Sequence, residues 1–360
     1  MKPRLKRTIE PIETPDGDLI LVRSGATDIR IAVPDSGERT LLGALDGNHS
    51  LVELEDRFGV EEVCDTIARM RELDLIEDAD DDELIPPADL ERFDRQFRYF
   101  ADLCHAGGVT PSACQERLRN ARVAILGVGG LGGRVAWELA CCGIGELWLI
   151  DGDRVEVSNL NRQIQYTEAD VGRLKVEAMA ERLRAFNSAI TVTSTARRME
   201  SEAQLADFIA GADLVVDAAD WPAHVIEGWC NAACFEAGIP HIGMAQFPPK
   251  VRVGPLYVPG ATGCHECQKI AWRRDYPLFE VTTEQLKAQP SPAATLGPSS
   301  GLIGAQVGMD IMHFLTGIAE PASLRTACIY DLRTMEVERI PVVPEPECSV
   351  CSHLQVVAVR

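Results

Sequence analysis

The sequence predicts an α/β protein in which a doubly wound parallel sheet follows a small α+β module. Two observations carry this prediction. From residue 121 onward, short apolar runs alternate with helical patterns, and a glycine-rich turn follows the first of these runs. The first 87 residues instead hold two short apolar runs, then three helical segments and an acidic stretch. We therefore expect three regions: residues 1–87, 88–120 and 121–360.

Composition restricts the function classes. The chain has 360 residues, of which 46% are hydrophobic and 25% charged, as in ordinary globular proteins. No stretch approaches the ~18 apolar residues that span a membrane, and no export signal follows the basic start. The formal charge of -20 argues against a surface that coats nucleic acid. We expect a cytoplasmic protein whose 12 cysteines are reduced thiols or metal ligands.

Residues 1–87 predict a winged-helix-like module of two strands and three helices. The strands are residues 19–23 and 29–33, joined by a turn that contains Gly25. A helix from residue 39, a turn at Asp46-Gly47 and a second helix with Ser50 as its N-cap follow. The third helix, within residues 60–76, has an apolar stripe made of Val63, Ile67, Met70 and Leu73.

Charge decides what this module binds. A helix–turn–helix would normally suggest DNA, but residues 1–87 hold ten basic and twenty-two acidic side chains, which phosphate would repel. Exposed strands 19–23 and 29–33 suit the capture of an extended peptide by strand addition. A dimerisation element or a structural cap remains the alternative. The acidic run 77–83 and the proline pair after it predict a solvated tether.

The rest of the chain predicts the parallel sheet. Residues 90–103 and 111–121 read as helices that link the two parts. Five β-rich runs then alternate with helical patterns, namely residues 122–127, 146–151, 190–195, 213–219 and 240–245. This alternation is typical of a Rossmann-like, doubly wound fold.

A nucleotide site is predicted where the first of these strands ends. The turn into the next helix holds Gly127, Gly129, Gly130 and Gly132. These glycines permit a tight turn and the close approach of backbone N–H groups to a phosphate. Asp151 ends the next strand and suits hydrogen bonds from ribose hydroxyls. At this point an NAD-dependent dehydrogenase is still possible.

The segments that follow decide between these possibilities. Asp151-Gly152-Asp153 runs into Ser158–Gln163 (SNLNRQ) and then Gly172-Arg-Leu-Lys175. Together with the glycine turn, this series closely resembles the ThiF-type, ubiquitin-activating-enzyme-like adenylyltransferases. That family includes activators of sulfur-carrier proteins and enzymes that adenylate microcin C-like peptides. The resemblance implies ATP and Mg²⁺, with a substrate carboxylate attacking the α-phosphate as pyrophosphate leaves.

The resemblance also implies roles for individual residues. The expected catalytic residues are Arg95, Arg162, Lys175 and Asp220. Arg95 would reach the active site of the partner in a homodimer, and Asp220 would hold magnesium unless Asp217 does. The remaining expected nucleotide-binding residues are the four glycines, Asp151, Asp153, Asn159 and Gln163. The family commonly has Asp-Asn where this chain has Asp220-Trp221, which suggests a reshaped wall on the substrate or adenine side.

Two CxxC pairs predict a metal site. Cys264 with Cys267, and Cys348 with Cys351, offer four thiolates to one structural Zn²⁺, and the resembling family has the same pairs. His265 and His353 are expected bystanders, and Cys230 with Cys234 packed thiols. Residues 270–295, where a thiol-transferring relative holds its acceptor, contain no cysteine, which favours direct use of the adenylate over a thioester.

Residues 297–316 predict a helix rich in small residues. In the resembling family this region lies near the active site and the dimer contact. Gly297 opens the helix, and Gly301, Gly304 and Gly308 permit close packing, either at that contact or within the core.

Residues 1–87 resemble the PqqD-like leader-peptide recognition modules of enzymes that modify ribosomally made peptides. This resemblance implies an enzyme that holds a precursor peptide by its leader and adenylates one of its carboxylates for a downstream modifying enzyme. Two alternatives remain: a sulfur-carrier protein adenylyltransferase, and a non-catalytic leader-binding partner of another enzyme. The carboxylate, at the C-terminus or on a side chain, and the nucleophile that captures the adenylate stay open.

Overall fold

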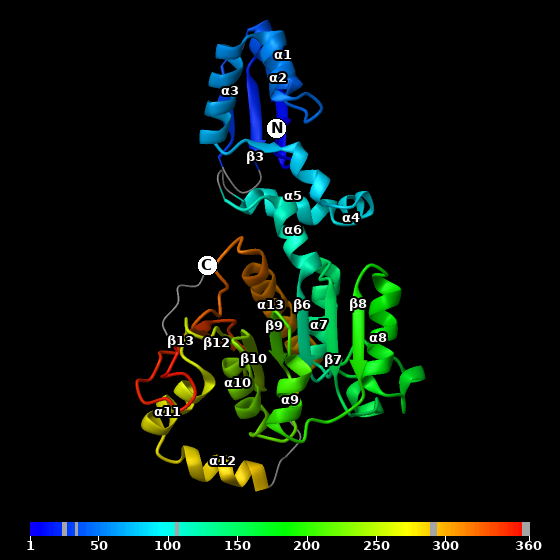
Figure 1. Ribbon diagram of the computed structural model, residues 1–360, viewed down its shortest axis with the longest axis vertical. Helices are drawn as coiled ribbons and strands as arrows, with labels where there is room; N and C mark the ends of the chain where they lie inside the picture. Colours follow the sequence, from blue (N-terminus) through cyan, green and yellow to red (C-terminus); the bar gives the residue numbers. More distant parts are fainter. Residues whose placement is uncertain (24–26, 33–34, 105–107, 289–293, 355–360) are drawn as a thin grey trace. The chain divides into compact units, whose positions relative to one another are not determined.

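The computed structural model describes residues 1–23, 27–32, 35–104, 108–288 and 294–354. It divides into two compact units, coloured in chain order in Figure 1. Unit 1 comprises Met1–Arg117 and Thr316–Ala319, and unit 2 comprises Leu118–Leu315 and Glu320–Arg360. Each unit is described by itself below.

Unit 1 contains two small antiparallel sheets. Strand β2 (Ile9–Glu13), β3 (Leu19–Arg23) and β4 (Ile29–Ile31) form one of them in that order. The strand predicted at residues 19–23 is confirmed, but it is central rather than exposed, because the unpredicted β2 pairs with it. The edges of this sheet are β2 and β4, so of the two predicted strands the one that contains β4 lies at an edge. The turn predicted at Gly25 and the end of the strand predicted to reach Val33 lie outside the described residues.

Three helices cover the core of this module. They are α1 (Ser36–Ala44), α2 (Leu51–Phe58) and α3 (Val60–Glu72). Ser50 caps α2 as predicted, and Glu53 completes a capping box with it. Val63, Ile67 and Met70 are buried against Leu21 and Leu54. Leu73 was expected in the same stripe, but it is 36% exposed because it caps the end of α3.

The acidic run is part of the folded unit, so the predicted solvated tether is wrong. Its start forms β5 (Ile76–Asp78), which pairs with β1 (Pro3–Leu5), and its remainder forms the 3₁₀ helix η1 (Ala79–Leu84). Arg4 donates to Glu77 and Asp82, each at 2.7 Å, and Arg7 contacts the same two carboxylates. The basic start of the chain thus neutralises the run and lets it pack.

Three more helices follow along the chain, and the last of them continues into unit 2. The predicted helix at residues 90–103 divides into α4 (Pro87–Arg92) and α5 (Asp94–Leu103), with a break at Phe93. Phe93, Phe97 and Phe100 are all buried, which fixes the break against the core. Helix α6 (Pro111–Asn120) is found where it was predicted.

Unit 2 is built on an eight-stranded sheet in the order β13-β12-β11-β10-β9-β6-β7-β8. The five predicted strands are all present and parallel, which confirms the doubly wound α/β fold. They are β6 (Arg122–Leu126), β7 (Glu146–Ile150), β8 (Thr191–Thr195), β9 (Leu214–Asp217) and β10 (His241–Phe247). Three antiparallel strands that were not predicted extend the sheet, so it is mixed: β11 (Lys250–Tyr257), β12 (Thr326–Asp331) and β13 (Val337–Pro341).

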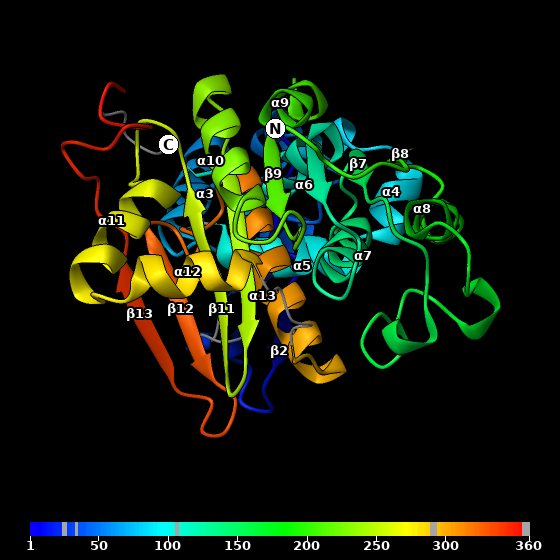
Figure 2. The same cartoon turned by 90° about the horizontal axis from the view of Figure 1, so that it is seen from below.

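Helices cover both faces of this sheet (Figure 2). One face carries α9 (Glu202–Ile209) and α10 (Ile226–Ala237), and the other α7 (Gly132–Cys142), α8 (Lys175–Phe186) and α13 (Gly297–Thr316). Helices α11 (His265–Asp275) and α12 (Phe279–Ala288) precede α13, and short 3₁₀ turns form η2 (Val157–Asn159) and η3 (Glu168–Asp170). Among the described helices none is long and apolar enough to cross a membrane.

Helices α13 and α7 pack closely through two of the predicted glycines. A Cβ atom on Gly304 would clash with the Arg134 side chain, and one on Gly308 would lie 2.9 Å from Glu138 Cβ. Gly301 instead faces open space within 4 Å of its Cβ position. The close packing is therefore within the chain at two of the three positions.

Candidate active site

The glycine turn, residues 127–132, leaves β6 at the carboxyl edge of the sheet and leads into α7. Gly127 has φ +83°, and a Cβ atom there would lie 2.8 Å from the carbonyl oxygen of Ala218. A Cβ on Gly132 would collide with the carbonyl of Gly127. Only glycine fits both positions, so the turn brings backbone N–H groups to the start of a helix, as an anion-binding site requires.

Two side chains that the sequence analysis did not single out hold this turn in place. Gln165 Nε2 donates to the carbonyls of Val128 at 3.1 Å and Gly129 at 2.9 Å. The Tyr166 hydroxyl donates to the same Val128 carbonyl at 2.8 Å, and burial raises the pKa of this tyrosine. Both residues lie within three positions of the end of SNLNRQ, so the stretch of chain that lies against the turn also holds it in place.

Asp151 stands at the end of β7 and faces the turn. Its carboxylate accepts hydrogen bonds from the backbone N–H of Val128 at 3.0 Å and of Asp153 at 2.8 Å. Burial raises the pKa of Asp151, against the charge of Lys175, which lowers it. Each carboxylate oxygen accepts up to two hydrogen bonds, so both retain capacity for a ligand hydroxyl.

Asp153 joins two cations at the same edge. Lys175 Nζ lies 3.0 Å from its Oδ2, and Arg198 Nη2 lies 2.6 Å from its Oδ1. Burial alone would raise the pKa of Asp153, but the hydrogen bonds from Arg198 and Lys175 outweigh it and lower the pKa. Lys175 opens α8 and is buried, with Asp153 as its ionic partner.

The segment SNLNRQ lies against the glycine turn. Buried Asn159 accepts from the backbone N–H of Glu156 at 3.0 Å through Oδ1. Arg162 lies beside Gly130, where a Cβ atom would be 3.3 Å from its Cγ. Its Nη1 donates to Ser158 O and Asn161 Oδ1, both at 2.9 Å. Gln163 is buried, and its Oε1 has no hydrogen-bond partner in the described part of the chain.

The start of α13 reaches the same place, as the family resemblance implies for this region. Ser300 Oγ would lie 3.3 Å from a Cβ on Gly130, and it accepts from Gln246 Nε2 at 2.8 Å. Ser299 donates to Gln246 Oε1 at 2.9 Å. Strand β10 and helix α13 thereby close one side of the turn.

The two candidate magnesium-binding carboxylates have different surroundings. Asp217 ends β9 and is buried, and its Oδ1 has no hydrogen-bond partner within the described ranges. Burial, together with the charge of Glu227, raises the pKa of Asp217 to about 8. Asp220 is exposed, and Trp221 beside it is 50% exposed. The end of β9 and the loop after it therefore offer one buried and one exposed carboxyl group.

Arg95 belongs to unit 1, in α5, and 93% of its side chain is exposed. Its nearest ionic partner among the described residues is Asp94, at 4.0 Å. An arginine in this state is available to another chain, and its catalytic role stays a prediction.

The four predicted cysteine ligands gather at one point. Their sulfur atoms all lie within 4.8 Å of one another, with Cys264–Cys348 at 3.5 Å and Cys267–Cys351 at 3.3 Å. Four thiolates around one zinc, with bonds of about 2.3 Å, would be about 3.8 Å apart, so the set fits Zn²⁺. Cys264 donates a hydrogen bond to Cys267, which lowers the pKa of Cys267 to about 5.

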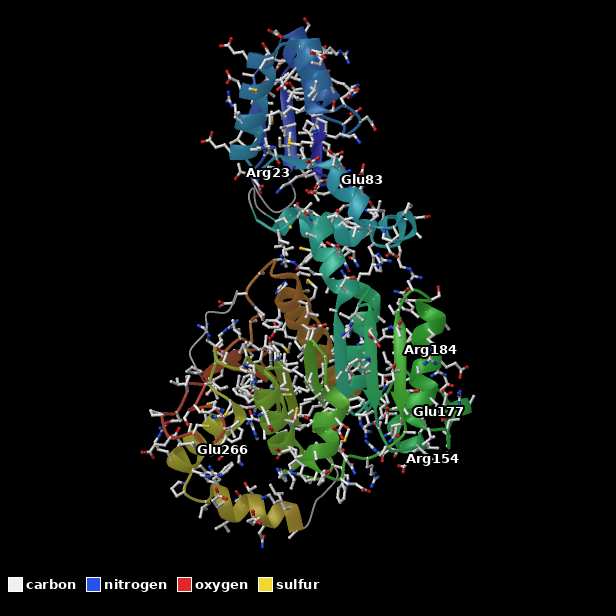
Figure 3. All side chains as sticks on the ribbon, in the orientation of Figure 1. Arg23, Glu83, Arg154, Glu177, Arg184 and Glu266 are labelled. Atoms are coloured by element: carbon white, nitrogen blue, oxygen red, sulfur yellow. The ribbon has the colours of Figure 1, made fainter. Side chains whose placement is uncertain are left out.

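The cysteine cluster lies within a hydrophobic core, as a structural metal site would. The four cysteines form a buried core with Phe235, Tyr257 and Val342. Figure 3 shows Glu266, in the same helix as Cys267, and Arg154, next to Asp153, on opposite sides of unit 2. Of the predicted bystanders, His265 is half-buried and His353 is exposed. Cys230 and Cys234 are fully buried in α10, as predicted.

Comparisons with known proteins agree with this arrangement. The ThiF family model matches residues 93–350. Two Escherichia coli relatives are 32% identical to this chain, and each comparison covers 66% of it. They are the molybdopterin-synthase adenylyltransferase, covered to 89%, and the sulfur carrier protein ThiS adenylyltransferase, covered to 88%.

The solved structures extend the likeness to almost the whole chain. E. coli MccB with ATP has a TM-score of 0.73 and 27% identity to this chain. The microcin C7 biosynthetic enzyme MccB with N-formylated MccA has a TM-score of 0.71 and 27% identity. Each comparison covers 98% of this chain and 100% of the other. The glycine turn, Asp151, SNLNRQ and Lys175 gather at one edge of a doubly wound sheet, and the ThiF family model covers this whole region. This chain therefore belongs to the ThiF family of adenylyltransferases.

Proposed function

We propose that this protein uses ATP to adenylate a carboxylate of a ribosomally made precursor peptide and releases pyrophosphate. The adenylated carboxylate is then ready for further modification of the peptide. The observation that carries the proposal is the likeness to MccB over 98% of this chain, residues before the ThiF match included. The sulfur-carrier adenylyltransferases match only 66% of it. A carrier protein as substrate is the second candidate, favoured by the higher identity of those relatives.

The site's own residues fit the chemistry of this proposal. Backbone N–H groups of the glycine turn, with Arg162 and Lys175, would bind the phosphates and neutralise the charge that develops as pyrophosphate leaves. Asp151 would orient the ribose. Magnesium, when bound, neutralises further phosphate charge. Exposed Asp220 is the carboxylate we assign to it, with the unpartnered oxygen of Asp217 as the nearby alternative.

We further propose that unit 1 selects the substrate and that the enzyme is a homodimer. Strand β4 is one of the two edges of the β2-β3-β4 sheet and one of the strands predicted from the sequence, so an extended leader peptide would pair with it through main-chain hydrogen bonds. The acidic surface of residues 1–87 would favour a leader with basic side chains. Arg95, exposed in α5, would complete the partner's active site. The cysteine cluster would hold one structural zinc ion.

The proposal is tested by pyrophosphate release from ATP in the presence of a short peptide encoded beside the gene. Lys175→Ala and Arg162→Ala should each reduce the rate by about 100-fold or more, because each removes a charge aimed at the phosphates. Lys287→Ala and Arg333→Ala are the matched controls, since within the described ranges each side chain forms one ion pair with a nearby residue, outside the proposed site. Circular dichroism should be unchanged in all four variants.

The outcomes separate the candidates. A peptide amidated at its C-terminus should lose turnover if the C-terminal carboxylate reacts and retain it if a side chain does. Turnover with a carrier protein ending in Gly-Gly, but with no peptide, would favour the second candidate. An Arg95→Ala chain mixed with an Arg162→Ala chain should regain part of the activity in a homodimer. Normal pyrophosphate release by the Lys175 and Arg162 variants would contradict the site.

A further inference from the structure

The hairpin of β10 and β11 extends beyond the carboxyl end of β9. Strand β9 ends at Asp217, which pairs with Gly243, and β10 continues past that point to Phe247. Strand β11 returns antiparallel to β10, with Arg252 opposite Ala245. At about 3.3 Å per residue, the Arg252 backbone lies about 7 Å past the end of β9, on the side of the proposed active site.

The Arg252 side chain turns back along this hairpin. Its Nη2 would lie 3.7 Å from a Cβ atom on Gly243, so the guanidinium lies over β10 at the position of that glycine. Asp217 and Gly243 are paired neighbours of β9 and β10, and their side-chain positions share one face of the sheet. The guanidinium is therefore level with the end of β9, from which the Asp220 loop leaves.

Arg252 carries a charge that the described part of the chain does not pair. The residue is half-buried, its Nε is buried without a hydrogen-bond partner, and none of the described ion pairs includes it. Asp217, across Gly243, also has a buried oxygen without a partner, yet the two side chains form no ion pair. A counter-charge for Asp217 would pair with it. Because a guanidinium stays charged and its burial costs free energy, this arrangement fits an anion that a ligand brings.

The strand order separates this anion from the phosphates of ATP. The glycine turn follows β6 and Asp151 follows β7, so phosphates and ribose would occupy the part of the edge at β6 and β7. In the order β11-β10-β9-β6-β7, the Arg252 guanidinium lies on the opposite side of β6 from β7. The strands β9 to β11 are thus the part of the edge left for the peptide as it approaches the α-phosphate.

Distance separates the anion from the reacting carboxylate as well. That carboxylate has to contact the α-phosphate at the glycine turn, whereas β10 is two strands, or about 10 Å, from β6. An extended peptide covers about 10 Å in three residues. A carboxylate at Arg252 would therefore belong to another residue, close to the reacting one in the peptide sequence.

We propose that Arg252 binds a second carboxylate of the substrate peptide, on an acidic residue within about three positions of the reacting carboxylate. The proposal rests on the proposed function, since it names the class of peptide that the same site accepts. Arg252 would select an acidic segment at the reacting end, whereas the acidic surface of residues 1–87 would favour a basic leader. The two selections act on different parts of one peptide, and Arg252 takes no part in the bond-making steps.

The experiment measures pyrophosphate release by the full-length protein with the short peptide encoded beside the gene. In synthetic versions, each Asp or Glu near the reacting end is changed singly to Asn or Gln. One version should lower kcat/KM of the natural chain about tenfold or more, through KM, which is the scale of one charged hydrogen bond. A version that abolishes turnover altogether would instead identify a reacting side chain.

Arg252→Gln should show the same loss with the natural peptide and no further loss with that amide version, because the pair is already broken. Its KM for ATP and its kcat at saturating peptide should be unchanged. Arg252→Glu should regain activity with a peptide that carries Lys at the same position, which a misfolded variant would not do. Arg333→Gln is the matched control, since Arg333 is exposed and paired with Asp331.

Two results would overturn the proposal. One is equal kcat/KM of the natural chain for the natural peptide and every amide version that still turns over. The other is an equal loss with both peptides in Arg252→Gln, which would make Arg252 a structural residue. If the natural chain releases no pyrophosphate with any of these peptides, the proposed function itself fails, and the inference fails with it.

Discussion

Asp170 holds together the segment between SNLNRQ and Lys175. Its carboxylate accepts from the Thr167 backbone N–H at 2.8 Å, from the Thr167 hydroxyl at 2.9 Å and from Arg173 at 3.0 Å, and it also contacts Arg182. Burial alone would raise the pKa of Asp170, but these hydrogen bonds and the Arg182 charge lower it to about 2. The start of α8, and with it Lys175, is placed through this carboxylate.

This shift predicts a pH dependence of stability. Because the pKa is lower in the folded chain than the ordinary value of 3.8, the stabilisation is present above about pH 4 and is lost as pH falls through about 2. Asp170→Asn should reduce the free energy of unfolding at neutral pH by about 2 kcal/mol. Its stability should also change less than that of the natural chain between pH 4 and pH 2.

Urea unfolding at several pH values measures both effects, with Asp275→Asn as the control. Asp275 is 72% exposed and contacts only Arg274 at 3.4 Å among the described ion pairs, so its removal should matter little. Parallel pH profiles for Asp170→Asn and the natural chain would show that Asp170 does not carry this acid-sensitive stability.

At the residue scale, spacing alone predicts the groups that lie next to one another along the chain. The glycine turn, Asp151 and the helix start at Lys175 follow from local pattern, and the structure brings them to one edge. Gln165, Tyr166 and Arg198 do not, because their partners are backbone carbonyls and a carboxylate of other loops. Such contacts exist only once the sheet has brought those loops together.

At the element scale, the pairing of the basic start with the acidic run determines how residues 1–83 fold. Arg4 and Glu77 are 73 residues apart in sequence, yet they join β1 to β5 with their side chains mostly buried. Strands of three residues carry no recognisable periodicity, and each charged segment by itself predicts a solvated chain. The tether prediction failed because it judged the acidic run without its partner.

Removing one member of this network should therefore destabilise unit 1. Arg4→Ala leaves Glu77 and Asp82 with Arg7 as their one cation among the described ion pairs, so we expect a loss of about 2 kcal/mol, the scale of a partly buried charged hydrogen bond. Lys2→Ala is the matched control, since Lys2 is more exposed than Arg4 and its ion pair with Asp80 lies at the surface. The loss should be larger for Arg4 than for Lys2, and it should shrink at low pH, where the carboxylates are neutral.

Hydrogen exchange of the β1 and β5 amides measures this directly. Faster exchange confined to these strands and η1 in Arg4→Ala is the expected result. Unchanged exchange rates, or equal losses of stability in the two variants, would mean that the contacts around Arg4 contribute nothing beyond an ordinary surface ion pair.

At the scale of the molecule, alternation of strands and helices predicts the parallel half of the sheet but not its antiparallel extension. Strands β6, β7 and β9 are mostly buried apolar runs, each recognisable by itself. Strand β13 is exposed along its whole length, and β11 to β12 are separated by three helices, so their pairing depends on long-range contacts. The CxxC pairs are the one sequence signal that joins these distant parts.

The last prediction follows from that link. Zinc on Cys264, Cys267, Cys348 and Cys351 would close a loop between positions 84 residues apart, so its binding energy would add to the folding energy of unit 2. The purified protein should contain about one zinc per chain. Cys348→Ser should lose that zinc and lower the unfolding midpoint by roughly 10 °C, as a loss of several kcal/mol does in a domain of this size.

Cys141→Ser is the control, because Cys141 is exposed on α7 and lies outside the cluster. Below its lowered midpoint, Cys348→Ser should bind ATP as the natural chain does, because Glu266, in the helix that holds Cys267, and Arg154, next to Asp153, lie on opposite sides of unit 2 (Figure 3). A loss of ATP affinity in a folded, zinc-free variant would assign the metal a direct part in the nucleotide site. Unchanged stability in a variant that has lost its zinc would instead mean that the metal does not stabilise the fold of the C-terminal strands.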